Sequence, residues 1–225
     1  MAKEKVYVSP SSQTDNKYAV GNTNEAVQCR KIAVSLVEAL ERCGFDAMTN
    51  TTGDMYQRTA ESNKWGAGLH LPIHTNAYNK KVQGTRIYCY NTTGKGYKAS
   101  KAIMATLKPI TPGTSDSINA RTNLYEINNA KAPVAYIEVA FHDNAEEAQW
   151  IIDHTVQIAE AICRGVCDYY GVEYAAPVVE VPDPEKTDVL YRVQVGAYSK
   201  KANAEDMKKK LKADGYDAII VEVKK

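Results

Sequence analysis

Three side chains that lie far apart in the sequence could bind a metal ion or transfer a proton: Glu25, His74 and Glu138. His74 follows a short, mostly apolar run that begins at residue 69, and small and polar residues come directly after it. A run of this length followed by turn-forming residues is typical of a buried strand. Neutral imidazole can serve as a metal ligand or as an acid and base, and ligands gather at the carboxyl ends of strands in open α/β sheets. His74 is therefore a candidate functional residue, with a polar strand cap as the alternative.

Glu138 interrupts the apolar run over residues 134–141, which predicts a buried strand. A carboxylate in such a strand is costly unless it is paired or bound to a metal ion, so its position favours a functional role. Glu25 lies on the apolar side of the first turn of a predicted helix. An acid in a first turn also interacts favourably with the helix dipole, and this alternative to a ligand role stays open.

Strands and helices alternate along most of the chain. The spacing of apolar residues predicts strands at residues 5–8, 46–49, 69–77, 85–90, 123–127 and 134–141, helices at 25–43, 56–64, 96–107 and 145–170, and a polar loop at 115–122. This order predicts an α/β fold, a three-layer sandwich with a largely parallel sheet. In such a sheet Glu25, His74 and Glu138 belong to the same edge, so we expect them to meet. One histidine and one carboxylate as ligands, with a further free carboxylate, suit a hydrolytic zinc site.

Composition excludes several other classes of protein. The 225-residue chain has a formal net charge of +1, which gives no electrostatic basis for binding nucleic acid or an anionic membrane. No stretch is long enough to insert into a membrane as a spanning helix. Residues 1–8 contain two lysines but no apolar signal core, so we expect synthesis in the cytoplasm without a signal peptide. The five cysteines form no CxxC pair and are expected to be small core residues.

The composition changes after residue 174. Residues 1–174 form the predicted main domain, 175–188 are rich in proline and acidic residues, and 189–225 follow as a small module. The proline-rich segment predicts an extended linker. The module has the strand–helix–strand pattern of a βαβ unit, which at this size buries little surface alone.

Residues 5–172 resemble the zinc-dependent N-acetylmuramoyl-L-alanine amidases that have an α/β catalytic domain. The matching motifs, in the order of that family, are Glu25-Ala26, Arg58 with Ser62-Asn63, Leu71-Pro72-Ile73-His74-Thr75-Asn76-Ala77, Gly84-Thr85-Arg86-Ile87-Tyr88, and Ala132 to Phe141 with Asn144.

The resemblance implies that Glu25 and His74 bind Zn²⁺ and that Glu138 is the catalytic carboxylate. Cleavage would occur at the amide between N-acetylmuramic acid and L-alanine of peptidoglycan. On the same basis we expect three residues to contact the substrate: Arg58, Asn76 and Asn144.

One part of the family pattern is missing. The family carries its first zinc histidine just after strand one, whereas this chain reads Val8-Ser9-Pro10-Ser11-Ser12-Gln13. The candidates for a third ligand are the amide oxygen of Gln13 and the imidazole of His142, and His142 has a substrate-contacting loop residue as its alternative. We expect His70 to be a core histidine and His154 to be solvated.

The tail, with Tyr191 to Tyr198 followed by Ala202 to Glu205, resembles the first half of a SPOR (sporulation-related) repeat, which binds peptidoglycan. Completion of the sheet by a second copy would make the protein a homodimer. We expect a cell-wall amidase, made in the cytoplasm and released to the wall as a phage or prophage endolysin. The alternatives are a peptidoglycan-binding protein without a complete metal site and a peptidase of the stem peptide.

Overall fold

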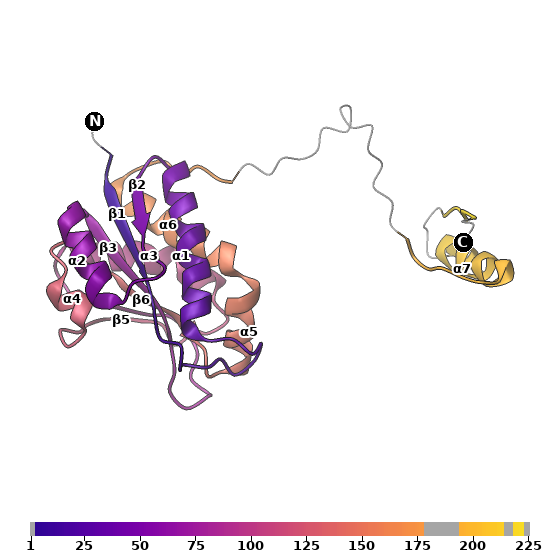
Figure 1. The fold of residues 1–225 in the computed structure, drawn as a ribbon, viewed down its shortest axis with the longest axis horizontal. Coiled ribbons are helices and arrows are strands. Elements are labelled where there is room, and N and C mark those ends of the chain that lie inside the picture. Colours follow the sequence, from indigo (N-terminus) through magenta and orange to yellow (C-terminus); the bar gives the residue numbers. More distant parts are fainter. Residues whose placement is uncertain (1–2, 178–193, 214–217, 223–225) are drawn as a thin grey trace. The chain divides into compact units, whose positions relative to one another are not determined.

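A computed structural model of the chain describes residues 3–177, 194–213 and 218–222 (Figure 1). Contacts within the chain divide it into two compact units, residues 1–177 and 178–225. The two units are described separately below.

The first unit is built on a six-stranded sheet with the strand order β2-β1-β3-β6-β4-β5. The strands are β1 (Lys5–Pro10), β2 (Asp46–Thr49), β3 (Leu69–Asn76), β4 (Arg86–Cys89), β5 (Ser117–Ala120) and β6 (Tyr136–Phe141). Strands β2, β1, β3 and β6 pair in parallel, whereas β4 pairs with β6 in antiparallel orientation and carries β5 parallel to itself. The predicted α/β fold with a largely parallel sheet is confirmed.

The helices are α1 (Glu25–Arg42), α2 (Met55–Trp65), α3 (Lys95–Leu107), α4 (Tyr125–Asn129), α5 (Ala145–Asp153) and α6 (Thr155–Tyr170), with a 3-10 turn at Lys108–Ile110. Local sequence explains where the first of these begins and ends. The Asn24 side chain accepts a hydrogen bond from the backbone N–H of Val27 at the start of α1. Gly44, with a φ of +89°, follows its end.

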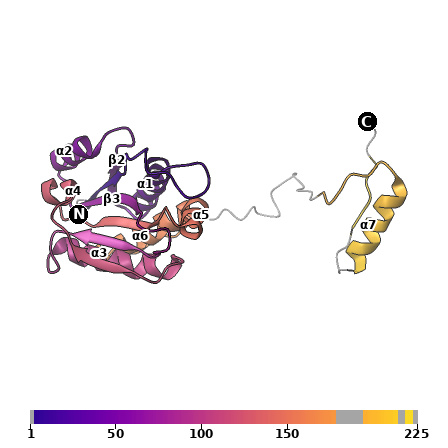
Figure 2. The same ribbon diagram turned by 90° about the horizontal axis from the view of Figure 1, so that it is seen from below.

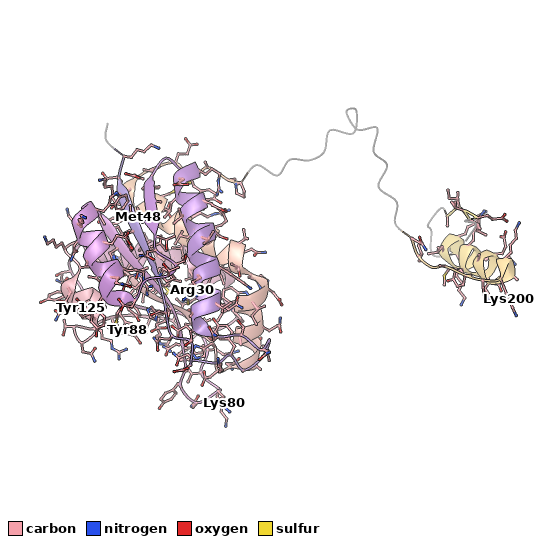
Figure 3. The ribbon with its side chains drawn as sticks, in the orientation of Figure 1. Arg30, Met48, Lys80, Tyr88, Tyr125 and Lys200 are labelled. Carbon is pink, nitrogen blue, oxygen red and sulfur yellow. The ribbon has the colours of Figure 1, made fainter. Side chains whose placement is uncertain are left out.

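The sheet lies between two groups of helices. Helix α6 packs against both α1 and α3, while α2 packs against α4 and β1 (Figure 2). Alternation along the strands separates the two faces: on β3, Leu71 and Ile73 belong to the main hydrophobic core, whereas His70 and His74 face the other way. Tyr125 of α4 lies on that second face (Figure 3). Its ring contacts the ring of Tyr56 in α2, with centroids 4.5 Å apart.

Three predicted elements differ in the structure. The predicted loop at residues 115–122 contains β5, which forms because β4 offers a parallel partner. The predicted strand at 123–127 is instead the short helix α4. The single helix predicted over 145–170 is broken at His154, which caps the end of α5 and the start of α6. His154 itself is half-buried, and its ring Nδ1 lies 2.9 Å from the Trp150 carbonyl oxygen.

In the second unit, the predicted helix is confirmed as α7 (Lys201–Ala213), which has no buried residue. Residues 194–198 and 218–222, which flank it, have no strand assignment, and the predicted βαβ unit stays a prediction because its strands also include residues outside the described part of the chain. The predicted linker falls mostly on residues 178–188, and part of the first predicted strand falls on 191–193, all outside the described residues. Among the described residues, no helix has the length and apolar character needed to cross a membrane.

Candidate metal and catalytic site

Glu25 and His74 lie in direct contact. The Oε1 atom of Glu25, in the first turn of α1, is 2.8 Å from Nδ1 of His74 near the end of β3. Both side chains are buried, with 1 % and 7 % of their residue surfaces exposed. The other carboxylate oxygen of Glu25 accepts a hydrogen bond of 2.6 Å from Nδ2 of Asn16. Two ligand types from distant parts of the sequence therefore converge at one point.

Glu138 lies beside this pair because β6 is the parallel neighbour of β3. His74 and Glu138 are register partners, so their side chains leave the sheet on the same face. The Oε2 atom of Glu138 is shielded from solvent and has no hydrogen-bond partner among the described residues. Burial raises the pKa of Glu138 to about 7, with the Glu25 carboxylate acting in the same direction and His74 opposing it. A carboxylate with this pKa accepts and releases protons near neutral pH.

Gln13 reaches the same pair from the loop after β1. Its side-chain nitrogen is 3.5 Å from Nδ1 of His74, and its oxygen accepts a hydrogen bond of 2.8 Å from Asn16. Gln13 is exposed, so the site is open to solvent on this side.

His142, the other candidate for a third ligand, is placed elsewhere. Its Nδ1 lies 3.0 Å from both the hydroxyl and the carbonyl oxygen of Thr75, and its ring stacks on Tyr18 at a centroid distance of 5.3 Å. The chain turns after Phe141, and this turn packs His142 into the interior with 4 % of its surface exposed. The structure therefore does not bring His142 to the Glu25–His74 pair.

The three predicted substrate-binding residues have different surroundings. Arg58 is 2 % exposed and donates hydrogen bonds to Ser9 Oγ at 3.0 Å and to the Gly53 carbonyl, so its guanidinium is used inside the protein. Asn144 caps α5 by accepting from two backbone N–H groups, and its Nδ2 donates to the Lys80 carbonyl at 3.1 Å. Asn76 is half-buried at the end of β3, close to His74. Of the three, Asn76 keeps the surroundings expected of a substrate contact.

Glu126 is the residue of this site that the sequence did not indicate. It lies in α4, is 2 % exposed, and its Oε2 is 3.9 Å from Nε2 of His74. Its Oε1 lies 3.2 Å from Nε2 of His70 and accepts a hydrogen bond from the Ser9 hydroxyl. His70 is fully buried and also contacts Ser62, so the prediction of a core histidine holds, although its partner is a residue of the site.

The charges of the site compensate one another. Burial by itself would lower the pKa of His74, but its contacts with Glu126 and Glu25 raise it to about 9. Burial by itself would raise the pKa of Glu126, yet hydrogen bonds with His70 and His74 lower it to about 2. The pKa of Glu25 is likewise lowered, because contacts with His74 and Asn16 outweigh its burial. Two of the three carboxylates are thus held ionised around one imidazole, and Glu138 is held near its ionisation point.

Comparisons with known proteins identify the family of the first unit. The profile of the N-acetylmuramoyl-L-alanine amidase family matches residues 6–168. The chain belongs to this family. A SPOR domain profile matches residues 173–225, which begins before the boundary at 189 predicted from composition.

Individual relatives support the assignment. A sporulation-specific N-acetylmuramoyl-L-alanine amidase of Bacillus subtilis is 25 % identical over 224 residues, covering 96 % of this chain and 84 % of the relative. Among solved structures, the amidase AmiC2 of Nostoc punctiforme has a TM-score of 0.68 at 19 % identity, covering 76 % of this chain and 98 % of its own. The catalytic domain of an endolysin that targets Clostridia Difficile has a TM-score of 0.62 at 19 % identity, covering 73 % and 97 %. These structures share the fold of the first unit.

Proposed function

We propose that this chain cleaves the amide between N-acetylmuramic acid and L-alanine of peptidoglycan at the site formed by Glu25, His74 and Glu138. The observation that carries the proposal is the 2.8 Å contact between Glu25 and His74, beside a Glu138 oxygen that has no hydrogen-bond partner in the described part of the chain. This arrangement provides two converging metal ligands and a neighbouring base, which are components of a hydrolytic metal site.

The residues present fit a zinc ion. An imidazole nitrogen and a carboxylate oxygen, both ligand types that zinc prefers, converge within 2.8 Å of each other, and the side-chain nitrogen of the Gln13 amide lies 3.5 Å from the same imidazole nitrogen. We propose that Glu25 and His74 hold Zn²⁺ with Gln13 as the third protein ligand. When bound, Zn²⁺ would polarise the scissile carbonyl and lower the pKa of a water molecule.

Three other residues are proposed to transfer the proton, to position His74 and to contact the substrate. Glu138, with a pKa of about 7, accepts a proton from water and delivers it to the leaving amine of L-alanine. The ring of Tyr136 stacks on His74 with centroids 4.5 Å apart, which restricts rotation of the imidazole. Asn76, at the end of β3, is the residue we propose for contact with the substrate.

The second unit is proposed to hold the enzyme on its substrate. Its match to the SPOR domain supports binding to peptidoglycan. Sedimentation with isolated sacculi tests this: the full chain should sediment, and a chain ending at residue 177 should sediment less. Equal sedimentation of the two would contradict a targeting role for this unit.

The predicted endolysin role and the predicted homodimer remain predictions. The relative from Bacillus subtilis is named for sporulation, and one structural neighbour is an endolysin domain. The comparisons therefore include both a sporulation amidase and an endolysin. Sedimentation equilibrium of the full chain tests the homodimer, which a monomeric mass would contradict.

Digestion of purified sacculi tests the proposed reaction. The zinc-loaded chain should release stem peptides with a free alanine amino terminus, which mass spectrometry identifies. Cuts within the stem peptide would indicate a peptidase instead. Binding of sacculi with no bound zinc and no cleavage would indicate a binding protein, the reading favoured by the missing histidine after β1.

A further inference from the structure

His74 has a carboxylate at each of its two ring nitrogens. Glu25 lies 2.8 Å from Nδ1, and Glu126 lies 3.9 Å from Nε2 on the opposite side of the ring. Gln13 is also on the Nδ1 side. The proposed ligands therefore gather at Nδ1, and Glu126 alone of these groups faces Nε2.

We propose that Glu126 is a positioning residue that accepts the Nε2 proton of His74 in a hydrogen bond and so leaves the Nδ1 lone pair free for the metal ion. Histidines bound to metal commonly donate their second ring N–H to a carboxylate, which fixes the tautomer and raises ligand basicity. The inference rests on the proposed function, because it assigns Nδ1 to the same zinc ion. It requires the 3.9 Å separation to shorten to roughly 3 Å in the zinc-bound protein.

Glu126 is itself held in place from the side away from His74. The Ser9 hydroxyl donates to its Oε1, and Arg58 donates to that same Ser9 oxygen at 3.0 Å. Nε2 of His70 is 3.2 Å from Oε1, and its Nδ1 is 2.9 Å from the Ser62 hydroxyl. With Oε1 engaged by these groups, Oε2 remains for His74.

Several buried residues on the second face of the sheet together hold Glu126 in place. Ser9 comes from β1, Arg58 and Ser62 from α2, and His70 from β3. All of them are at most 2 % exposed. They connect three elements of the fold to one carboxylate, and that carboxylate connects them to the imidazole of the site.

Zinc affinity of full-length variants tests the proposal. Competition with a chromogenic chelator should show about tenfold weaker zinc binding for Glu126→Gln and up to about 100-fold weaker binding for Glu126→Ala. The matched control is Glu147→Gln, which removes another buried carboxylate, one that accepts from the backbone N–H groups of Gly84 and Phe141. This control should lower thermal stability and leave zinc affinity unchanged.

The tautomer of His74 provides a readout that a merely structural role would not change. The chain has four histidines, so ¹H–¹⁵N spectra of the zinc-loaded, histidine-labelled protein are simple to assign. We expect His74 to carry its proton on Nε2 and to bind zinc through Nδ1. In Glu126→Gln, which retains the volume of the side chain and is expected to fold, the Nε2 proton should exchange faster with water.

Three results would overturn the inference. The first is zinc binding through Nε2 of His74, and the second is zinc affinity of Glu126→Gln within twofold of wild type. If either occurs while the wild-type chain binds zinc and cleaves sacculi, the positioning role fails and the proposed function stands. The third is a wild-type chain that binds no zinc, which would overturn the metal-dependent function and the positioning role together.

Discussion

The two ends of helix α1 carry two buried clusters of metal-ligating residue types, and they differ in charge. Glu25 begins the helix and contacts His74, whereas Cys43 follows its last residue and lies 3.7 Å, sulfur to sulfur, from Cys163 in α6. Cys167 completes this second cluster, in which the three Sγ atoms lie within 4.8 Å of one another. The 18-residue length of α1 separates the clusters by roughly 27 Å.

The two clusters differ in whether neighbouring charged groups offset the effect of burial on the pKa of their side chains. Burial raises the pKa of Cys167 to about 12 and raises that of Cys163 further, so these two thiols are neutral and pack as small apolar side chains. At the other end of α1, contacts with His74 overcome the effect of burial on Glu25, and contacts with His70 and His74 overcome it on Glu126. Both clusters bring ligand atoms together, and they differ in whether neighbouring groups of the protein favour the charged form of the buried side chains.

The largest effect should come from replacing the base. Glu138→Gln should reduce cleavage of sacculi by about 10³-fold, since it removes the group that transfers the proton while retaining the shape of the side chain. Zinc content should remain at the wild-type level. Activity within tenfold of wild type, measured by release of soluble muropeptides, would show that Glu138 is not the base.

Removing the imidazole of His74 should show which of the two clusters binds zinc. His74→Ala should weaken zinc binding by more than about 100-fold, because it deletes a proposed ligand rather than a group that supports one. Equilibrium dialysis followed by metal analysis measures this. Retention of one tightly bound zinc in this variant would place the metal elsewhere, with the thiol cluster as the first candidate.

Glu138 also resembles the thiols because its burial outweighs the groups that favour its charged form, and this predicts a pH effect on stability. Its folded-state pKa of about 7 lies above the ordinary value of 4.5, so the metal-free fold is favoured below pH 4.5 and loses stability as the pH rises through 7. Glu138→Gln should remove this loss and stabilise the metal-free protein at pH 8 by roughly 2 kcal/mol. Urea denaturation of both proteins at pH 5 and pH 8 gives the comparison, and an equal pH dependence would contradict the shift.

The smallest effect should come from the thiol cluster. Cys43→Ala should lower the free energy of unfolding by about 1 kcal/mol through lost packing and leave zinc content and cleavage unchanged. Chemical denaturation and metal analysis of the same preparation measure both quantities. Loss of zinc in this variant would contradict the view that these cysteines are core residues.

Most of the fold followed from local sequence because each element carries its own signal. The apolar runs of β1, β3 and β6, the Asn24 cap and the glycine after α1 all act over a few residues. The errors arose where the signal was not local. β5 exists because β4 pairs with it, and α4, with five residues, is too short to show helical periodicity.

By itself, the sequence determined that Glu25, His74 and Glu138 would share one edge of a parallel sheet, because the order of strands and helices constrains where strand ends lie. The tertiary structure alone decided that Glu126 joins them, that His142 turns away toward Thr75, and that Arg58 lies inside the network rather than at the surface. These outcomes depend on how α4, α2 and the loop after β6 pack on the sheet. Packing of this kind is set by contacts between residues distant in the chain, for which no local pattern exists.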